Sequence, residues 1–310
     1  MRSDPSAVAD DDLLSMLLTR RFEEELLRMA ATGDIRGTTH TCLGQEYIPV
    51  ALERLLHPDD FVLSHHRGHG HYLARFGDVT GLLAELLGRQ GAVCGGVGGS
   101  QHIHRPGYLS TGVQGESLPI AVGIALHFKR RALERCAVAY IGDGTWGEGA
   151  VYEALNMAAL WSVPLVVVVE NNGIAQTTPT SAHMAGSIAA RAAAFGIAYQ
   201  RIEGTDIDEI RADLRMDFNE SRKSSKPFIV EFVTHRVGPH SKGDDARTAQ
   251  QIREAELADW YPAYAFAHQA QTREIESIAR KQLDDAIEEV RRRPLVSAPR
   301  LAAEHAGDGE

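Results

Sequence analysis

Residues 136–147 read CAVAYIGDGTWG, and residues 164–173 read PLVVVVENNG. Each stretch opens with a continuous apolar run, over 136–142 and 164–170, which is typical of a strand buried on both faces of a parallel sheet. A helical pattern over 147–160 lies between them, so the sequence predicts a β-α-β unit. Asp143 and Asn171-Asn172 follow the two strands. Neighbouring parallel strands end at the same edge of a sheet, where ligands bind in open α/β folds, so we expect these side chains to lie together there.

The same alternation continues outward from this unit. Helices are predicted over 11–31, 45–56, 79–88, 118–133, 186–194, 206–222, 249–270 and 274–292, and further strands over 197–203 and 227–233. The sequence therefore predicts an α/β fold, with an open, mainly parallel sheet and helices on both faces. We expect a single domain over 1–297 that ends in the C-terminal helices, followed by a disordered tail over 298–310. The glycine-rich stretch 91–99 and the polar stretch 234–250 are predicted loops.

The composition disfavours several classes of function. The 310 residues include 32 Lys plus Arg and 42 Asp plus Glu, so the formal charge is 32 − 42 = −10. A general electrostatic contact with nucleic acid or an anionic membrane is therefore not expected. Three cysteines without a CxxC spacing and a polar N-terminus without an apolar signal segment favour a cytoplasmic protein. The longest apolar stretch, 163–169, is far shorter than a membrane span.

Gly142, Gly144 and Gly147 fit the pattern GxGxxG of dinucleotide-binding folds, and Glu170 ends the next strand, where such folds place a ribose-binding acid. Asp143 disfavours this interpretation, because its carboxylate would lie beside a doubly charged diphosphate. A divalent cation between them removes the conflict.

Carboxylate and amide oxygens are the ligands that Mg²⁺ prefers in proteins. Asp143 and the amide of Asn171 or Asn172 would supply them at one sheet edge, together with a phosphate of the ligand. An alternative remains for each residue by itself, in which Asp143 caps the following helix and the two asparagines form a turn. The combination of the three residues favours a magnesium site.

The sequence Gly142-Asp143-Gly144, followed by a helix, a strand and Asn171-Asn172, resembles the thiamine diphosphate (ThDP) and magnesium motif. The neighbouring motifs resemble the alpha subunit of the decarboxylating component of 2-oxo acid dehydrogenase complexes, of the pyruvate and acetoin types. These motifs are THTCLGQE (39–46), SHHRGHG (64–70), GGVGGSQHIH (95–104), EALNMAALW (153–161), ENNG (170–173) and HRVGPHSKGDD (235–245). The resemblance extends from about residue 12 to residue 290 and implies the ThDP-binding fold of the diphosphate-binding type.

The resemblance implies a role for each matching residue. Metal ligands would be Asp143, Asn172 and the carbonyl of Ile174. The implied cofactor-binding residues are His66, Arg67, Gly112, Gln114, Gly142, Gly144, Thr145 and Arg236. Among these, Arg67 and Arg236 would contact the diphosphate, as would the backbone amides of Gly144 and Thr145, while Gly112 and Gln114 would approach the aminopyrimidine. His40, His69 and His240 match active-site histidines that handle the substrate or the reacting carbon.

Four positions depart from the family pattern. His66 stands where tyrosine is usual, and Ile174 replaces another frequent tyrosine. Thr145 replaces a small residue, and GVQGESLP (112–119) differs from the usual GIVGAQVP. All four changes fall on the predicted cofactor site, so they bear on the choice of substrate.

The remaining loop histidines are expected to be structural, because an isolated histidine in a loop is usually solvated or hydrogen-bonded within the fold. These are His65, His71, His102 and His104. A zinc site built from His66, His69 and His71 is only weakly indicated, since their spacing fits no helical face.

The resemblance also implies partners. ThDP chemistry needs a carboxylate that is hydrogen-bonded to the aminopyrimidine ring, and in the resembling family a glutamate of the beta subunit supplies it. We therefore expect half an active site in an α₂β₂ heterotetramer, with a 2-oxo acid or acyloin as substrate and a lipoyl-bearing acyltransferase as acceptor. Two alternatives stay open: the diphosphate-binding subunit of a split transketolase-like enzyme, and a non-catalytic regulatory subunit that retains the fold.

Overall fold

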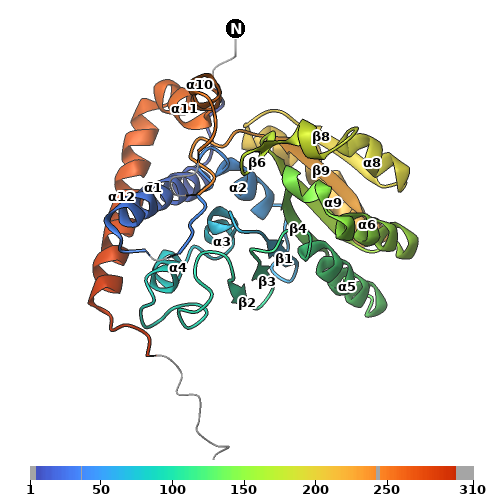
Figure 1. Ribbon diagram of the computed structural model, residues 1–310, viewed down its shortest axis with the longest axis horizontal. Coiled ribbons are helices and arrows are strands. Elements are labelled where there is room, and N and C mark those ends of the chain that lie inside the picture. The colour runs from blue at the N-terminus through green and yellow to red at the C-terminus, as the bar shows by residue number, and fades with distance from the viewer. Residues whose placement is uncertain (1–4, 36, 242–244, 298–310) are drawn as a thin grey trace, which may run out of the picture.

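The computed structural model describes residues 5–35, 37–241 and 245–297 (Figure 1). The helices are α1 (Asp10–Thr32), α2 (Tyr47–Glu53), α3 (His69–Phe76), α4 (Val79–Leu86), α5 (Ser117–Arg130), α6 (Gly149–Trp161), α7 (Thr180–His183), α8 (Ile188–Ala194), α9 (Ile207–Ser224), α10 (Ala249–Leu257), α11 (Trp260–Ala267) and α12 (Gln269–Arg292), with a 3₁₀ turn η1 (Asp143–Gly147). The strands are β1 (Phe61–Ser64), β2 (His104–Arg105), β3 (Tyr108–Ser110), β4 (Ala137–Gly142), β5 (Leu165–Asn171), β6 (Ile174–Ala175), β7 (Thr178–Pro179), β8 (Ala198–Ile202) and β9 (Phe228–Val233).

Seven of these strands form one sheet in the order β2-β3-β1-β4-β5-β9-β8. Every neighbouring pair is parallel except β2 and β3, which form an antiparallel edge. The prediction of an open, mainly parallel sheet with helices on both faces is confirmed. The central unit β4-α6-β5 is the β-α-β unit that the sequence predicts within residues 136–173.

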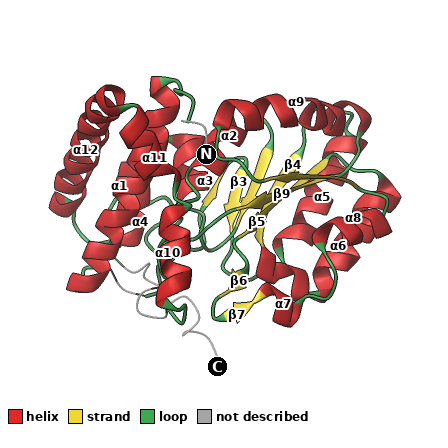
Figure 2. Ribbon diagram, turned by 90° about the horizontal axis from the view of Figure 1, so that it is seen from above, coloured by secondary structure: helices red, strands yellow, loops and turns green. Residues whose placement is uncertain are grey.

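The central strands are apolar throughout because both of their faces are buried. Val166 and Val168 of β5 point into one core, whereas Leu165, Val167 and Val169 point into the other. The second core is closed by α5, α6 and α8, which cover one face of the sheet (Figure 2). Burial on both sides explains why these strands show no polar alternation.

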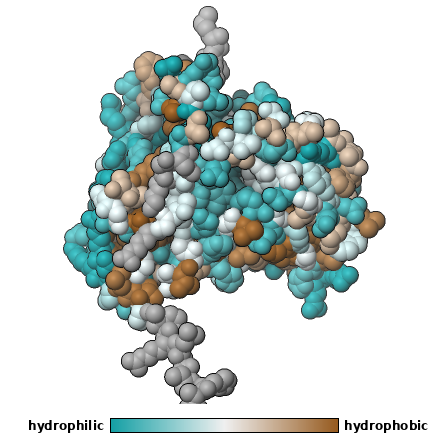
Figure 3. Space-filling view, viewed as in Figure 1, coloured by the Kyte–Doolittle hydropathy of each residue, from teal (hydrophilic) through white to brown (hydrophobic). Residues whose placement is uncertain are grey.

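The first core is larger because helices extend it beyond the sheet. α1 and α12 pack against each other at the side of the molecule away from β8 (Figures 1 and 2). The inner face of α12 is buried at helical spacing, through Ile275, Ala279, Leu283, Ala286 and Val290. Its outer face is hydrophilic (Figure 3), as expected of an amphipathic helix on the surface. Among the described helices, none combines the length and apolarity needed to cross a bilayer.

The structure corrects several boundaries. The predicted helix 249–270 is two helices, because Asp259 accepts a hydrogen bond from the backbone of Tyr261 and begins α11. The next helix begins at 269, not 274. Strands β1, β2 and β3 and helix α3 were not predicted from the sequence. The single domain over 1–297 stays a prediction, and the tail 298–310 lies outside the described residues, as do residues 242–244 of the predicted loop 234–250.

Candidate functional site

The six parallel strands end at one edge of the sheet, and the loops after five of them, β1, β3, β4, β5 and β9, contribute to one site. The register pairs Ser64 of β1 with Ser110 of β3, and Gly142 of β4 with Glu170 of β5. The loops that follow these strands surround a cavity of about 620 Å³. This is the crevice in which open α/β sheets bind ligands, and it is where the sequence places Asp143 and Asn172.

Twelve of the fourteen predicted site residues line this cavity. They are His40, His66, Arg67, Gly112, Gln114, Gly142, Asp143, Gly144, Thr145, Asn172, Ile174 and His240. The two predicted residues that the lining does not include are His69 and Arg236. The tertiary structure thus brings together loops separated by up to 200 residues in the sequence.

The three predicted metal-binding residues, Asp143, Asn172 and Ile174, line the cavity. Asp143 is 2% exposed and accepts a hydrogen bond from the hydroxyl of Thr180. Among the described residues, no lysine or arginine forms an ion pair with Asp143. Burial raises the pKa of its carboxyl, and the hydrogen bond from Thr180 opposes this shift. A buried carboxylate without a basic partner is the environment in which a bound cation is most stabilising.

The two asparagines have different surroundings. Asn171 turns away from the cavity, since its Nδ2 donates to Glu231 Oε1 (2.6 Å) and its Oδ1 accepts from Gly173 N (3.0 Å). Asn172 lines the cavity, and its Oδ1 accepts only a long hydrogen bond from Ile174 N (3.3 Å). Both asparagines therefore make the turn contacts of the alternative interpretation, but of the two only Asn172 lines the cavity together with Asp143.

Asp143 does not cap a helix with its side chain. The residue before α6 is Glu148, which makes no side-chain capping bond, and η1 begins after Gly142 without one. The backbone approaches closely here: a Cβ on Gly144 would lie 2.6 Å from the Cβ of Ala175. A side chain at position 144 would clash with β6, so the close approach of these two segments requires glycine here.

Arg67 and Arg236 occupy different places. Arg67 is 4% exposed, and its guanidinium donates to the carbonyl of Thr41 (2.6 Å) and to that of His240 (3.3 Å). It lines the main cavity, and its predicted contact with the diphosphate stays a prediction. Arg236 is buried and lines a smaller cavity of about 170 Å³ that shares Asn172 and Ile174 with the main one. A contact between Arg236 and the ligand of the main cavity stays a prediction.

Three of the cavity histidines form a cluster. The ring centroid of His40 lies 4.5 Å from that of His66 and 4.7 Å from that of His240. One ring nitrogen of each lies within 4.8 Å of the others. These rings come from three separate loops, so a ligand in the cavity meets a polar wall of imidazoles.

His69 lies outside this cluster and is not part of the cavity lining. It is 1% exposed, with Nδ1 3.0 Å from Glu23 Oε2 and Nε2 2.8 Å from Ser100 Oγ. Glu23 also accepts from the backbone of Cys42 (2.9 Å). His69 therefore joins α1 to two cavity loops, and a direct catalytic role for it stays a prediction.

A second buried cluster was not predicted. Glu170, at the end of β5, faces two histidines: His65 Nε2 lies 2.8 Å from Oε2, and His71 Nε2 lies 3.1 Å from Oε1. His65 Nδ1 accepts the backbone N–H of Arg67 (3.0 Å), so its proton lies on Nε2 and is donated to Glu170. The cluster thus fixes the backbone of loop 65–67, which lines the cavity, to the strand β5 that leads to Asn172.

His66, His69 and His71 thus belong to three different clusters, so the three do not converge on one metal. Burial by itself raises the pKa of Glu170, but the charge of His71 and the hydrogen bonds from both histidines lower it well below its usual range. His71 also stacks on Tyr140 at 3.8 Å. The expectation that His65 and His71 are structural agrees with these contacts. The sequence signal for them was weak, since Glu170 and His65 are 105 positions apart.

We expect stability to fall as the pH drops below about 6.5. Burial lowers the pKa of His65, and burial together with the neighbouring charges of His65 and Arg67 lowers that of His66 well below its usual value. Below about pH 6.5 the unfolded chain therefore binds protons that the folded chain does not, and each histidine contributes up to about 1.4 kcal/mol per pH unit.

Denaturant unfolding at about pH 7.5 and about pH 5.5 measures this dependence. The double variant His65→Asn/His66→Gln should show a smaller loss than the wild-type chain, whereas His102→Gln, at an exposed position, should not change it. An unchanged pH dependence in the double variant would contradict the assignment.

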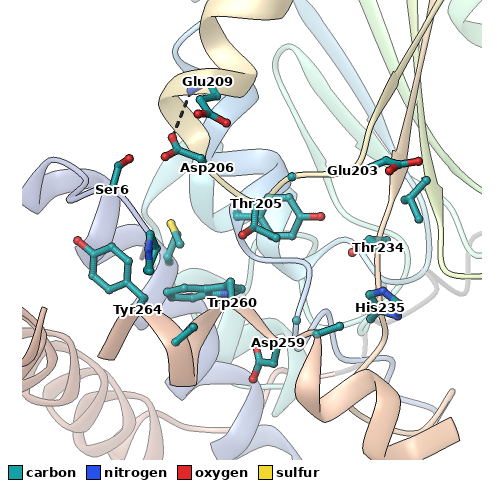
Figure 4. Close-up of a pocket in the computed structure, with 18 of the residues that line it drawn as sticks. Ser6, Glu203, Thr205, Asp206, Glu209, Thr234, His235, Asp259, Trp260 and Tyr264 are labelled. Atoms are coloured by element: carbon teal, nitrogen blue, oxygen red, sulfur yellow. Dashed lines mark hydrogen bonds between the residues drawn. The ribbon is translucent and has the colours of Figure 1, made fainter. Parts of the chain in front are cut away.

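A second cavity, of about 670 Å³, lies beyond the ends of β8 and β9 (Figure 4). Trp260 and Tyr264 of α11 form one side, and Asp206 and Glu209 of α9 lie opposite. Asp206 caps α9 through the backbone of Asp208 and Glu209. Asp206 therefore has a structural role, and the cavity lining includes none of the predicted site residues.

The sequence matches a known protein family over most of its length. The family described as "Dehydrogenase E1 component" matches residues 14–298. The chain belongs to the dehydrogenase E1 component family. The match extends over both cores and all of the strand ends described above, so it confirms the family resemblance predicted from the motifs.

Individual relatives of this E1 chain support the family assignment. It is similar to the pyruvate dehydrogenase E1 component subunit alpha of Rhizobium meliloti, with 36% identity over 77% of the chain and 70% of the relative. The enzyme of the same name from Zymomonas mobilis is 39% identical over 75% and 67%. The alpha subunit of acetoin:2,6-dichlorophenolindophenol oxidoreductase from Bacillus subtilis is 36% identical over 74% and 70%.

A solved structure of a Mycobacterium smegmatis protein, assigned as a thiamin diphosphate-dependent enzyme, overlaps this E1 chain with a TM-score of 0.43 at 21% identity. The overlap covers 64% of the chain and 33% of that structure. It is too small to add to the family assignment, which rests on the sequence matches.

Proposed function

We propose that this E1 chain is the alpha subunit of a ThDP-dependent 2-oxo acid dehydrogenase of the pyruvate or acetoin type. The observation that carries the proposal is the buried Asp143 together with Asn172, at the sheet edge where Gly144 and Thr145 of η1 line the same cavity. Family membership favours this function over the split transketolase-like alternative.

The residues present fit a diphosphate bound through Mg²⁺. Asp143, Asn172 and the Ile174 carbonyl are hard oxygen donors of the kind that Mg²⁺ takes. Gly144 and Thr145 supply backbone amides, and Arg67 supplies a guanidinium on the facing loop. A buried carboxylate, an amide oxygen and an arginine on one cavity are a donor set for a metal-bound diphosphate.

When bound, ThDP supplies a thiazolium carbon that adds to a carbonyl and stabilises the carbanion left after decarboxylation. The chain's part is to bind and orient the cofactor and to move protons near it. His40 and His240 line the cavity and are the candidates for holding a proton near the substrate oxygen. Arg67 contacts the backbone of His240 and would place that histidine when the diphosphate is held.

The described chain offers three carboxylates on the cavity: Asp143, Glu148 and Glu170. Asp143 is the proposed metal ligand, and Glu170 is occupied by two histidines. Glu148 is exposed at the rim. Each of the three thus has another role or is exposed, which supports the proposal that a beta subunit supplies the glutamate for the aminopyrimidine in an α₂β₂ assembly. A lipoyl-bearing acyltransferase as acceptor and a cytoplasmic location remain part of the proposal.

We expect no turnover by the chain alone and turnover once its partner is present. The chain is co-expressed with the beta subunit encoded nearest to it, and a panel of 2-oxo acids and acetoin is assayed with an artificial electron acceptor. Reduction of the acceptor should require ThDP, Mg²⁺ and both chains.

The matched control for this assay is Glu148→Gln in the same two-chain preparation. It should keep activity, since the partner supplies the essential carboxylate. Turnover by the chain alone that Glu148→Gln abolishes would contradict the half-site proposal. A complete assembly that binds ThDP but turns over no substrate would favour the non-catalytic alternative.

A further inference from the structure

One wall of the main cavity is a chain of three hydrogen-bonded side chains. The hydroxyl of Thr145 donates to Gln114 Oε1 (3.0 Å), and Gln114 Nε2 approaches His66 Nδ1 at 2.7 Å. All three residues line the cavity, although they follow three different strands, β4, β3 and β1. The contacts therefore join three loops into one wall.

The orientation of the Gln114 amide follows from its third contact. Gln114 Nε2 also lies 3.5 Å from the carbonyl oxygen of Gly112. A carbonyl can only accept, so the amide nitrogen, not the amide oxygen, faces Gly112. Turning the amide by 180° would set the Gln114 and Gly112 oxygens against each other, and it would require the Thr145 hydroxyl to reorient and accept from the amide nitrogen. The Gln114 amide is thus held with its N–H group toward His66.

This orientation decides which nitrogen of His66 carries the proton. Because Nδ1 accepts from Gln114, the proton of the neutral ring lies on Nε2. His66 Nε2 makes no hydrogen bond to another described residue, while the ring lines the cavity. The N–H group at Nε2 is left for a ligand.

We propose that Thr145 and Gln114 are positioning residues that hold His66 in its Nε2–H tautomer, so that His66 donates a hydrogen bond to a phosphate or carboxylate oxygen in the cavity. Family resemblance assigns Thr145 through its backbone and Gln114 through the aminopyrimidine; the side-chain relay is a separate role. Only the identity of the ligand oxygen rests on the proposed function.

The same tautomer bears on the cluster of His40, His66 and His240. A transition metal would need the lone pair of a ring nitrogen, but on His66 one nitrogen carries the proton and the other is occupied by Gln114. The arrangement suits an anionic oxygen, and Arg67, on the same loop, adds a positive charge.

The tautomer can be measured directly on the cofactor-free chain. With ¹⁵N-labelled histidine, long-range ¹H–¹⁵N spectra distinguish a protonated from an unprotonated ring nitrogen, and the His66 signals are assigned by their loss in His66→Gln. We expect an unprotonated Nδ1 in the wild-type chain. Gln114→Glu replaces the facing donor by an acceptor, so the proton should move to Nδ1.

Thr145 supplies the matched pair of variants. Thr145→Val keeps the shape but removes the hydroxyl, so the Gln114 amide can rotate and His66 should show both tautomers. Thr145→Ser keeps the hydroxyl and should restore the wild-type spectrum. A proton on Nδ1 in the wild-type chain, or a spectrum unchanged by both Gln114→Glu and Thr145→Val, would overturn the proposal.

Two probes identify the ligand oxygen. Inorganic diphosphate with Mg²⁺ and pyruvate are added separately, and the His66 Nε2–H signal is followed. A shift with diphosphate assigns the contact to the cofactor, and a shift with pyruvate assigns it to the substrate. A shift with neither overturns the donor role.

If diphosphate is the ligand, Thr145→Val should weaken its binding about fivefold and Thr145→Ser should not, as expected for a misdirected hydrogen bond to a charged group. Equal affinity in both variants would contradict the positioning role. The tautomer is measured without ThDP, so it would stand or fall independently of the proposed dehydrogenase activity.

Discussion

Replacing Asp143 with alanine is expected to weaken Mg²⁺-dependent ThDP binding by about two orders of magnitude or more. Losing a direct ligand should exceed the effect of losing an outer partner of a metal site, which costs about 10- to 100-fold in affinity. Calorimetry with ThDP, in the presence and absence of Mg²⁺, measures the change. Asp143→Asn keeps an oxygen donor without the charge and should lose less.

Stability separates this effect from misfolding. Asp143 is buried without a lysine or arginine partner among the described residues, and burial raises the pKa of its carboxyl. The cofactor-free Asp143→Ala chain should therefore unfold at the wild-type temperature or above it. Asp284→Ala removes an exposed carboxylate and should change neither binding nor stability. Unchanged, metal-independent ThDP binding by Asp143→Ala would remove the basis of the proposed function.

Replacing Glu170 with alanine is expected to lower the free energy of unfolding by about 3 kcal/mol. The carboxylate is 3% exposed and accepts from two buried histidines, His65 and His71. Its removal leaves both donors without an acceptor inside the fold. Urea unfolding measures the loss, and Glu274→Ala, on the exposed face of α12, is the control with an expected change near zero.

Two further variants separate the parts of this cluster. Glu170→Gln keeps one acceptor and should cost about half as much as Glu170→Ala. His65→Asn keeps an acceptor for the N–H of Arg67, because an asparagine oxygen reaches the backbone two residues on, but it loses the contact with Glu170. His65→Asn should therefore bind ThDP better than His65→Ala. Equal stability of Glu170→Ala and Glu274→Ala would show that the cluster does not hold the fold.

The β-α-β part of the fold was predictable because its strands are long and wholly apolar. The predicted strands 136–142 and 164–170 match β4 and β5 to within one residue at each end. β1 is four residues long, FVLS, and leads into the polar run HHRGHG, so neither its length nor its pattern marked it. β2 and β3 are shorter still, and their pairing is set by the sheet.

The site was predictable where motifs carry it and not where tertiary contacts make it. Asp143 and Asn172 meet because they end adjacent parallel strands, a relation visible in the sequence. His69 matched a motif, yet its contacts with Glu23 and Ser100 hold it outside the cavity lining. Its position depends on how α1 packs, which no local pattern records.

By itself, the sequence determined the parallel sheet, the edge at which ligands bind and the presence of Asp143 and Asn172 there, since apolar runs and strand ends are local properties. Only the tertiary structure decided which histidines face the cavity, that Glu170 joins His65 to His71, and that Thr145 and Gln114 orient His66. These side-chain positions depend on hydrogen bonds between residues far apart in the chain. Their direction is fixed only when the loops have been packed against one another.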